Sequence, residues 1–328
     1  MLKIEHVSKT FNLGTINEKK ALIDINLQLD DGDFVTVIGG NGAGKSTLMN
    51  MIAGVYPIDC GHIKLDDKDI SLYPEYKRAG LIGRVFQDPM MGTAADMQID
   101  ENLAMAKRRG QKRTLKWGIK KEEKKLYYDL LKTLNLGLEE RMTSKVGLLS
   151  GGQRQRVAFA RALAPNPSVL LLDEPFAAID AKVRTELRTW LRSMVTRLGI
   201  TSIFVTHDQD EAVEVADEII ITNHGKIEQM GSPIEIYKSP ATPFVVEFIG
   251  KASEVNDYSK LKGFDEIQGA KRAIIRPEFV KLSKYGKLQQ YNSAAEEGYV
   301  EDILFRGNHL DVTVNTVSYT HLTLPTNS

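Results

Sequence analysis

The sequence has little cysteine, no charge imbalance and no long apolar run, and each shortage excludes a class of protein. Cys60 is the only cysteine, which excludes a disulfide framework or a cysteine-based zinc module and favours a reducing compartment. The 43 Lys and Arg residues balance 43 Asp and Glu residues, so no overall positive field is expected to hold nucleic acid. No stretch approaches about 18 uncharged apolar residues, which predicts no membrane-spanning helix. Residues 1–6 carry charge too early for a secretory signal.

The remaining composition is that of a folded protein with ordinary cores. The chain has 328 residues, of which 42% are hydrophobic and 26% are charged, and this excludes a wholly disordered chain. At roughly 150 residues per domain, the length allows two domains. Because no membrane-spanning helix is predicted, any role at a membrane is expected to act through a partner protein.

A glycine-rich loop follows a strongly apolar segment near the N-terminus. Residues 34–38 are β-branched and aromatic and predict a buried strand. They lead into Gly39-Gly40-Asn41-Gly42-Ala43-Gly44-Lys45-Ser46-Thr47, a match to the P-loop pattern G-x-x-x-x-G-K-[ST], before a predicted helix at 48–53. Glycines allow backbone N–H groups to surround phosphates, and the start of a helix adds a favourable dipole. The pattern predicts that Lys45 reaches the β- and γ-phosphates of a nucleotide and that the Ser46 hydroxyl binds Mg²⁺.

Four further polar motifs follow in order, three of them where an apolar strand is predicted to end. They are Gln87, Ser150-Gly151-Gly152-Gln153 at the start of a helix, Asp173-Glu174 and His207. Each has a plainer alternative: Gln87 as a surface residue, Ser150 and Asp173 as helix caps, and His207 as a loop residue. Because the carboxyl ends of parallel strands meet at one edge of a sheet, the motifs together predict a single nucleotide site.

The set of motifs resembles the ATPase subunit of an ABC transporter, and the resemblance covers residues 1–250. It implies an α/β P-loop NTPase fold with a helical subdomain at about residues 88–150. It also implies that Glu174 is the general base for the attacking water and that His207 contacts the γ-phosphate. By the same resemblance, Asp173 holds Mg²⁺, partly through water, and Gln87 senses Mg²⁺ and water while linking the site to the permease.

The resemblance further implies that ATP joins two copies of the chain in a homodimer. Ser150, Gly151 and Gly152 would close on ATP held by the opposite subunit, and Asp180 would cross the dimer interface. Phe11 matches the aromatic residue that stacks on adenine, with a core phenylalanine as the alternative. The nucleotide contacts implied are Phe11, Gly39, Gly40, Asn41, Gly42, Ala43, Gly44, Lys45, Ser46, Thr47, Ser150, Gly151, Gly152, Gln153 and Asp180.

The partners implied are transmembrane permease subunits and, indirectly, an extracytoplasmic solute-binding protein. The chain is thus expected at the cytoplasmic face of the membrane as a peripheral protein. Residues 107–125 carry ten Lys or Arg against two Glu. A solvated face is the favoured interpretation of this run. Contact with permease loops or anionic headgroups is the alternative, and nucleic-acid binding is a poor third.

Beyond residue 250 the pattern changes to short, partly alternating segments that predict a small antiparallel barrel. Arg276-Pro277-Glu278 and residues 305–310 resemble the accessory domain of sulfate/thiosulfate importer ATPases, which places an incomplete β domain at 251–316. Residues 317–328 contain no Asp, Glu, Lys or Arg. Their back-translation resembles a transposon adapter used in sequencing libraries, so they are interpreted as a non-biological tail, with a frayed terminus as the alternative.

The two halves of the chain resemble different subfamilies. Residues 1–155 resemble ATPases of a tryptophan- or tyrosine-type importer, and residues 156–316 resemble those of sulfate/thiosulfate importers. The apparent junction at 150–156 predicts a chimera, from either a recombinant gene or a joined read. The sequence therefore predicts the ATPase of an importer, with sulfate or thiosulfate as the first substrate and an amino acid as the alternative. An ABC ATPase of DNA repair or translation and a non-functional chimera are the rivals of another class.

Overall fold

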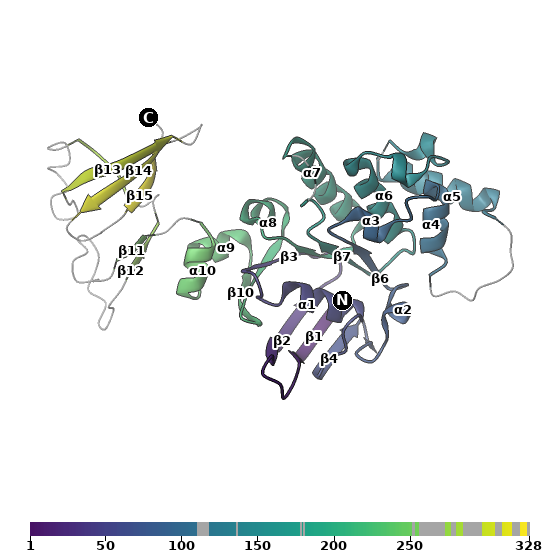
Figure 1. Ribbon diagram of the computed structural model, residues 1–328, viewed down its shortest axis with the longest axis horizontal. Helices are drawn as coiled ribbons and strands as arrows, with labels where there is room; N and C mark the ends of the chain where they lie inside the picture. Colours follow the sequence, from purple (N-terminus) through teal and green to yellow (C-terminus); the bar gives the residue numbers. More distant parts are fainter. Residues whose placement is uncertain are drawn as a thin grey trace. The chain divides into compact units, whose positions relative to one another are not determined.

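The structure is a computed structural model. It describes residues 1–109, 118–135, 137–177, 179, 181–250, 253–255, 273–276, 280–284, 297–305, 310–316 and 322–326. These residues divide into two units, Met1–Ser239 and Pro240–Ser328 (Figure 1). Asp180, Pro277, Glu278 and residues 306–309, to which the sequence analysis gives roles, lie outside the described residues.

A six-stranded sheet forms the centre of the first unit, in the order β10-β9-β3-β8-β7-β6. Its strands are β3 (Phe34–Gly39), β6 (Ile82–Val85), β7 (Val169–Asp173), β8 (Thr201–Val205), β9 (Glu218–Asn223) and β10 (Lys226–Gly231). All neighbours pair in parallel except β9 and β10, which form an antiparallel hairpin. Every residue of β3 is buried, as its apolar sequence predicts for a parallel strand covered on both faces. The strands predicted before the polar motifs are thus confirmed, and their carboxyl ends share one edge.

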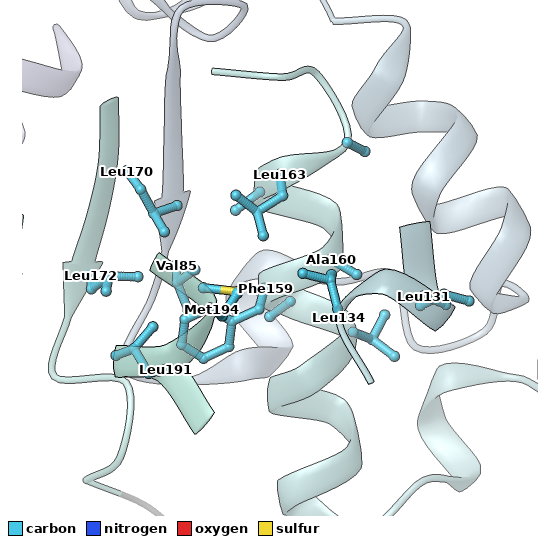
Figure 2. Close-up of a cluster of buried hydrophobic side chains, with 14 of the residues drawn as sticks. Val85, Leu131, Leu134, Phe159, Ala160, Leu163, Leu170, Leu172, Leu191 and Met194 are labelled. Carbon is cyan, nitrogen blue, oxygen red and sulfur yellow. The ribbon is translucent and has the colours of Figure 1, made fainter. Parts of the chain in front are cut away.

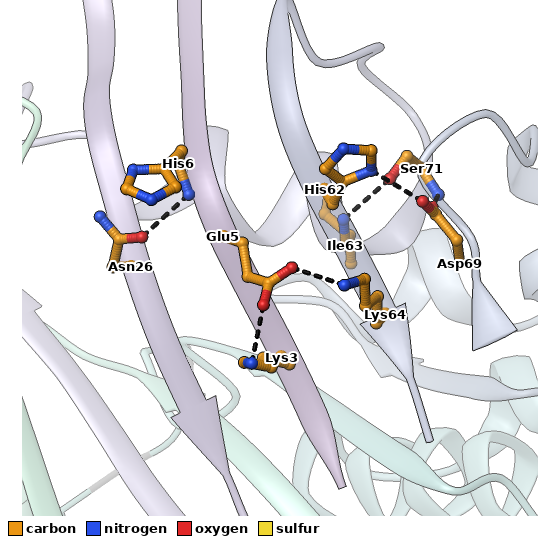
Figure 3. A network of polar contacts seen from close by, with 9 residues as sticks. All are labelled: Lys3, Glu5, His6, Asn26, His62, Ile63, Lys64, Asp69 and Ser71. Atoms are coloured by element: carbon orange, nitrogen blue, oxygen red, sulfur yellow. Dashed lines mark hydrogen bonds and ion pairs between the residues drawn. The ribbon is translucent and has the colours of Figure 1, made fainter. Parts of the chain in front are cut away.

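A smaller antiparallel sheet precedes and follows β3 in the chain, with the order β2-β1-β4-β5. Its strands are β1 (Leu2–Phe11), β2 (Lys19–Leu29), β4 (Cys60–Leu65) and β5 (Lys68–Asp69). Figure 3 shows polar side chains on this sheet, where the Glu5 carboxylate accepts from Lys3 and Lys64, each at 2.7 Å. Hydrogen bonds from Lys3 and Lys64 lower the pKa of Glu5 to about 2. Glu5 therefore stays ionised over the whole physiological pH range.

The first unit also contains helices, on either side of β6 and β7 in the chain. They are α1 (Lys45–Ala53), α2 (Glu75–Arg78), α3 (Pro89–Gly92), α4 (Ile99–Lys107), α5 (Lys121–Thr133), η1 (Glu139–Arg141), η2 (Val146–Leu148), α6 (Gly151–Leu163), α7 (Ala181–Leu198), α8 (Gln209–Val215) and α9 (Pro233–Lys238). No strand falls between β6 and β7 among the described residues, so the predicted helical subdomain is part of the fold. Among the described residues, no helix has both the length and the apolar character needed to cross a bilayer.

Three arginines spaced four residues apart on α7 face two acidic residues of α8 and one in the segment between α8 and β9. Arg184 Nε lies 3.9 Å from Glu211 Oε1, and Arg188 lies 3.1 Å from Glu214. Arg192 lies 2.6 Å from Asp217 and also donates to the carbonyl of Val215. Residues four apart lie on one face of a helix, so this arginine row aligns α7 along α8.

Two hydrophobic clusters pack on opposite faces of the six-stranded sheet. Along β7, Leu170 and Leu172 belong to the cluster that includes α5, α6 and α7, whereas Val169 and Leu171 belong to the cluster that includes α1 and the antiparallel sheet. The alternation follows from the two-residue period of a strand. Figure 2 shows the first cluster, in which Phe159 lies among side chains of several elements. The sheet is therefore the middle layer of the unit.

The predicted junction at 150–156 can be tested through the first cluster, because this cluster contains residues from both sides of the junction. Tyr127 and Leu131 precede the junction, Phe159 and Leu163 follow it, and all four are buried. If the two sides came from different proteins, mismatched side-chain volumes would cost about 1–3 kcal/mol each. Scanning calorimetry would then record a low or multi-step unfolding transition. A single sharp transition at an ordinary mesophile temperature would contradict the chimera.

The second unit contains one helix and two small antiparallel sheets among its described residues. Its elements are α10 (Pro243–Phe248), β11 (Ser253–Val255), β12 (Ala273–Ile275), β13 (Gly298–Phe305), β14 (Leu310–Thr316) and β15 (Leu322–Thr326). β11 pairs with β12, and the other three strands form the order β13-β14-β15. β15 lies within the segment interpreted as a non-biological tail and pairs with β14. The origin of that segment stays a prediction.

Candidate nucleotide-binding site

The glycine-rich loop connects β3 to α1, and its backbone geometry depends on glycine. Gly44 caps α1 with φ 100, and a Cβ at this position would lie 2.6 Å from the carbonyl oxygen of Ala21. A side chain is therefore excluded both by conformation and by space. Lys45 Nζ donates to the carbonyls of Gly39 at 2.7 Å and Gly40 at 3.1 Å. The ammonium group is thus held against the loop, at the start of the helix.

The loop forms one wall of an open pocket of about 230 Å³. The lining residues are Phe11, Lys19, Ala21, Asn41, Gly42, Ala43, Gly44, Lys45, Ser46, Thr47 and Glu174. The structure thus brings together the loop, the aromatic residue and the carboxylate that the sequence assigned to one nucleotide site. Lys19 and Ala21 were not predicted, because they come from β2, which carries no motif.

The ring of Phe11 lines this pocket and is half-buried. Its centroid is 5.3 Å from that of Tyr56 with the rings at 81°, and Lys9 Nζ lies 5.7 Å from the Phe11 ring. Tyr56 is 36% exposed. An aromatic ring with an accessible face can stack on a base, and Tyr56 limits the direction from which a base could approach.

Two consecutive carboxylates stand at the end of β7. Glu174 adopts φ 42, a left-handed conformation that is costly for a residue other than glycine. Its N–H donates to the carbonyl of Val205 at 2.9 Å, which ties the turn to β8. Burial raises the pKa of Asp173, although Arg84 opposes the shift. The pKa of Lys45 is lowered by burial, and the negative charges of Glu174 and Asp173 oppose this shift. The lysine and both carboxylates therefore share one electrostatic environment.

His207 follows β8 and lies against Glu174. Its Nδ1 is 3.2 Å from Glu174 Oε1, and its side chain is 66% exposed. The preceding Thr206 donates from its hydroxyl to Glu211 Oε2 at 2.7 Å and accepts from the N–H of Asp208 at 3.0 Å. Burial raises the pKa of Glu211. Thr206 and Glu211 fix the turn that presents His207, and neither was predicted from the sequence.

Gln87 and Asp173 line a second pocket of about 640 Å³, together with Asn50 and Arg84. Ser46, the third predicted magnesium ligand, lines the loop pocket instead. Within the part of the chain that the structure describes, no three His, Cys, Asp or Glu side chains group closely enough to hold a metal. The three predicted magnesium ligands include only one of these residue types, Asp173; the other two are the hydroxyl of Ser46 and the amide of Gln87. All three supply oxygen donors, which are the ligands that Mg²⁺ prefers, with water completing its shell.

Residues 150–153 form a capping box at the start of α6. The N–H of Gln153 donates to Ser150 Oγ at 3.4 Å, and the N–H of Ser150 donates to Gln153 Oε1 at 3.2 Å. Ser150 and Gly151 are exposed. None of the four residues lines the loop pocket or the second pocket. The cap interpretation of Ser150 is therefore confirmed, and the exposed loop remains free to contact another molecule.

A larger groove of about 900 Å³ lies beside α2, β6 and α4, and arginines dominate its charge. Its charged lining residues are Arg78, Arg84, Arg108, Arg109, Arg161, Glu75 and Glu101. Arg78 is 1% exposed and donates to four backbone carbonyls. Burial lowers the pKa of Arg161 to about 10. The sequence did not indicate this groove, because its arginines are scattered over residues 78–161.

Comparison with known proteins agrees with this geometry. The family description "ABC transporter" matches residues 22–177. The sulfate/thiosulfate import ATP-binding protein CysA of Synechocystis is 41% identical over 95% of this chain and 83% of its own length. CysA of Synechococcus elongatus is 43% identical over 79% of this chain and 71% of its own. The match to the Synechocystis protein extends across residues 150–156, because it leaves only a small share of the chain unaligned.

Solved structures of ATP-binding cassettes are similar as well. A dimeric cassette in a post-hydrolysis state with ADP and Pi is 31% identical, has a TM-score of 0.60, and covers 71% of this chain and 98% of its own. A nucleotide-free cassette from an ABC transporter is 30% identical, has a TM-score of 0.64, and covers 76% of this chain and 99% of its own. The predicted α/β P-loop NTPase fold is therefore confirmed, and the C-terminal β-barrel-like domain stays a prediction.

Proposed function

Because the chain belongs to the ATP-binding proteins of ABC transporters, we propose that it hydrolyses ATP to energise a sulfate or thiosulfate importer. One observation carries the chemistry: the P-loop lysine, the aromatic Phe11 and the carboxylate Glu174 line the same pocket. The relatives named above are sulfate/thiosulfate import proteins, and the proposed substrate is inferred from them. The rival function in DNA repair or translation finds no support among them.

Glu174 would be the general base in the pocket, and His207, whose Nδ1 lies 3.2 Å from Glu174 Oε1, would contact the γ-phosphate. Glu174, which has a left-handed backbone conformation, lines the same pocket as Lys45. A carboxylate that faces water beside a fixed cation suits phosphoryl transfer, which requires positioning and charge stabilisation more than covalent chemistry. Phe11 would stack on adenine and Lys45 would contact the terminal phosphates.

Mg²⁺ would be held by Ser46, Asp173 and Gln87. When bound, the ion supplies positive charge that offsets the charge of the phosphate oxygens. The residues of this chain do the rest: Asp173 and Ser46 orient the ion relative to the loop, and Gln87 links that position to the second pocket.

The active form would be a homodimer in which residues 150–153 of one subunit cover the nucleotide of the other. The exposure of Ser150 and Gly151, away from both pockets of their own chain, supports this arrangement. Asp180 would reach across the same interface. ATP would then act as the link between the two copies.

The membrane partners would be permease subunits at the cytoplasmic face, with an extracytoplasmic solute-binding protein acting indirectly. The arginine-rich groove is the surface offered for the permease, since it lies beside the helical subdomain and contains Phe86, next to Gln87. The alternative substrate is an amino acid, which rests on the resemblance of residues 1–155. Uptake of radiolabelled sulfate, or of tryptophan, by cells that carry this chain with its permease distinguishes the two.

Replacing Lys45 by Ala is expected to weaken ATP binding by about 10-fold or more, because hydrogen bonds to charged groups contribute about 1.5–3 kcal/mol. Phosphate release by the purified chain and titration with a fluorescent ATP analogue measure the effect. Lys238→Ala, which removes an exposed lysine from the end of α9, is the matched control. Wild-type affinity in Lys45→Ala would contradict the site, and the absence of phosphate release by the wild type would contradict the proposed function.

A further inference from the structure

One arginine connects the carboxylate proposed for Mg²⁺ with the helix that follows the P-loop. Arg84 lies on β6, and one guanidinium nitrogen donates to Asn50 Oδ1 of α1 at 2.8 Å. Another donates to Asp173 Oδ2 at 3.3 Å. Its guanidinium carbon also lies 4.6 Å from the centroid of the Phe86 ring. The side chains of Arg84 and Asp173 are 13% and 20% exposed, respectively, so solvent screens the pair only weakly.

This arrangement fixes the direction of the Asp173 side chain. The planar guanidinium offers its donors in a rigid fork, and here that fork is itself held by the amide of Asn50 and the face of Phe86. The contact engages Oδ2 of the carboxylate. Partners that hydrogen-bond a metal-ligating carboxylate orient it toward the metal. Asn50 belongs to the helix that begins at Lys45, so the same fork also sets the distance between that helix and β7.

We propose that Arg84 is a positioning residue that aims the Asp173 carboxylate at the Mg²⁺ of bound ATP. The proposal rests on the proposed ATPase function. Arg84 also lines the arginine-rich groove, so a group that fills the groove contacts the same guanidinium that orients Asp173. The ion pair joins residues 89 positions apart in the chain.

The test is to measure metal binding directly in Arg84→Ala and Arg84→Lys. Binding of Mn²⁺ in place of Mg²⁺, with a non-hydrolysable ATP analogue present, is followed by electron paramagnetic resonance. The Mg²⁺ concentration that gives half-maximal ATPase activity is the second readout. We expect Arg84→Ala to weaken Mn²⁺ binding by about 10-fold or more. Arg84→Lys should restore part of it, since an ammonium group keeps the charge but not the fork.

The matched control is Arg188→Ala, which removes an arginine of nearly equal exposure (14%) that pairs with Glu214 rather than with Asp173. Nucleotide binding in the presence of EDTA separates a loss of metal binding from a loss of phosphate binding, and a loss there as large as the loss with Mn²⁺ would overturn the proposal. Metal binding and Mg²⁺ dependence within about twofold of the wild type in both Arg84 variants would also overturn it. An equal loss in Arg188→Ala would overturn it too. If Arg84→Ala does not fold, Arg84→Lys against Arg188→Ala decides. A wild-type chain that binds Mn²⁺ with the nucleotide but releases no phosphate would contradict the proposed function and leave this test readable.

Discussion

Glu174→Gln should slow ATP turnover by about 100-fold or more, because a positioned general base contributes about 100- to 10,000-fold to the rate. The amide keeps the size of the carboxylate but cannot accept a proton from water. ATP binding should persist, since Lys45 and the loop backbone are unchanged. With hydrolysis blocked, ATP is expected to hold a stable dimer that elutes early in size-exclusion chromatography.

Glu186→Gln provides the control, because it makes the same chemical change at an exposed position of α7. Its turnover should match that of the wild type. Near-normal hydrolysis by Glu174→Gln would assign the base to another residue. A variant that loses both turnover and ATP binding would instead indicate that Glu174 holds the pocket together.

Phe159→Ala should lower the free energy of unfolding of the first unit by about 3–5 kcal/mol, the usual cost of removing a buried aromatic ring. Phe159 is fully buried (Figure 2). Its ring centroid lies 5.1 Å from that of Trp190 and 6.5 Å from that of Phe176. It lies on α6, and the cluster around it also includes β7 and α7. The cavity would therefore open between the sheet and the helices that cover it.

Urea unfolding followed by circular dichroism measures this loss. Leu148→Ala is the control, because Leu148 is 79% exposed and an exposed substitution usually changes stability by less than about 0.5 kcal/mol. A loss below about 1 kcal/mol in Phe159→Ala would mean that neighbouring side chains fill the space.

The parts of the fold that could be predicted from the sequence are those that depend on a pattern of neighbouring residues. Apolar runs such as 169–172 predict strands buried on both faces, and a glycine-rich loop between a strand and a helix predicts a phosphate site. Both require only neighbouring residues. The left-handed conformation of Glu174 was not predictable in this way, since it depends on the carbonyl of Val205, more than thirty residues later.

The residues that were missed act through contacts distant in sequence. Arg84 carries no motif, and its significance comes from Asn50 and Asp173, which only the folded sheet brings to it. Tyr56 and Glu211 are similar cases, because each supports a predicted residue from another element or turn. The antiparallel sheet that begins the chain was also not predicted, although its β2 supplies Lys19 and Ala21 to the pocket.

The arginine row of α7 limits how this helix can vary in length. Arg184, Arg188 and Arg192 reach Glu211, Glu214 and Asp217 because they share one face. An α-helix turns by about 100° per residue, so one residue inserted after Arg184 would swing both later arginines away from their carboxylates at once. Point substitutions remove one pair each, whereas an insertion or deletion removes several. Among homologues with the same pairs, the stretch from 184 to 192 should therefore vary in composition but hold a constant number of residues.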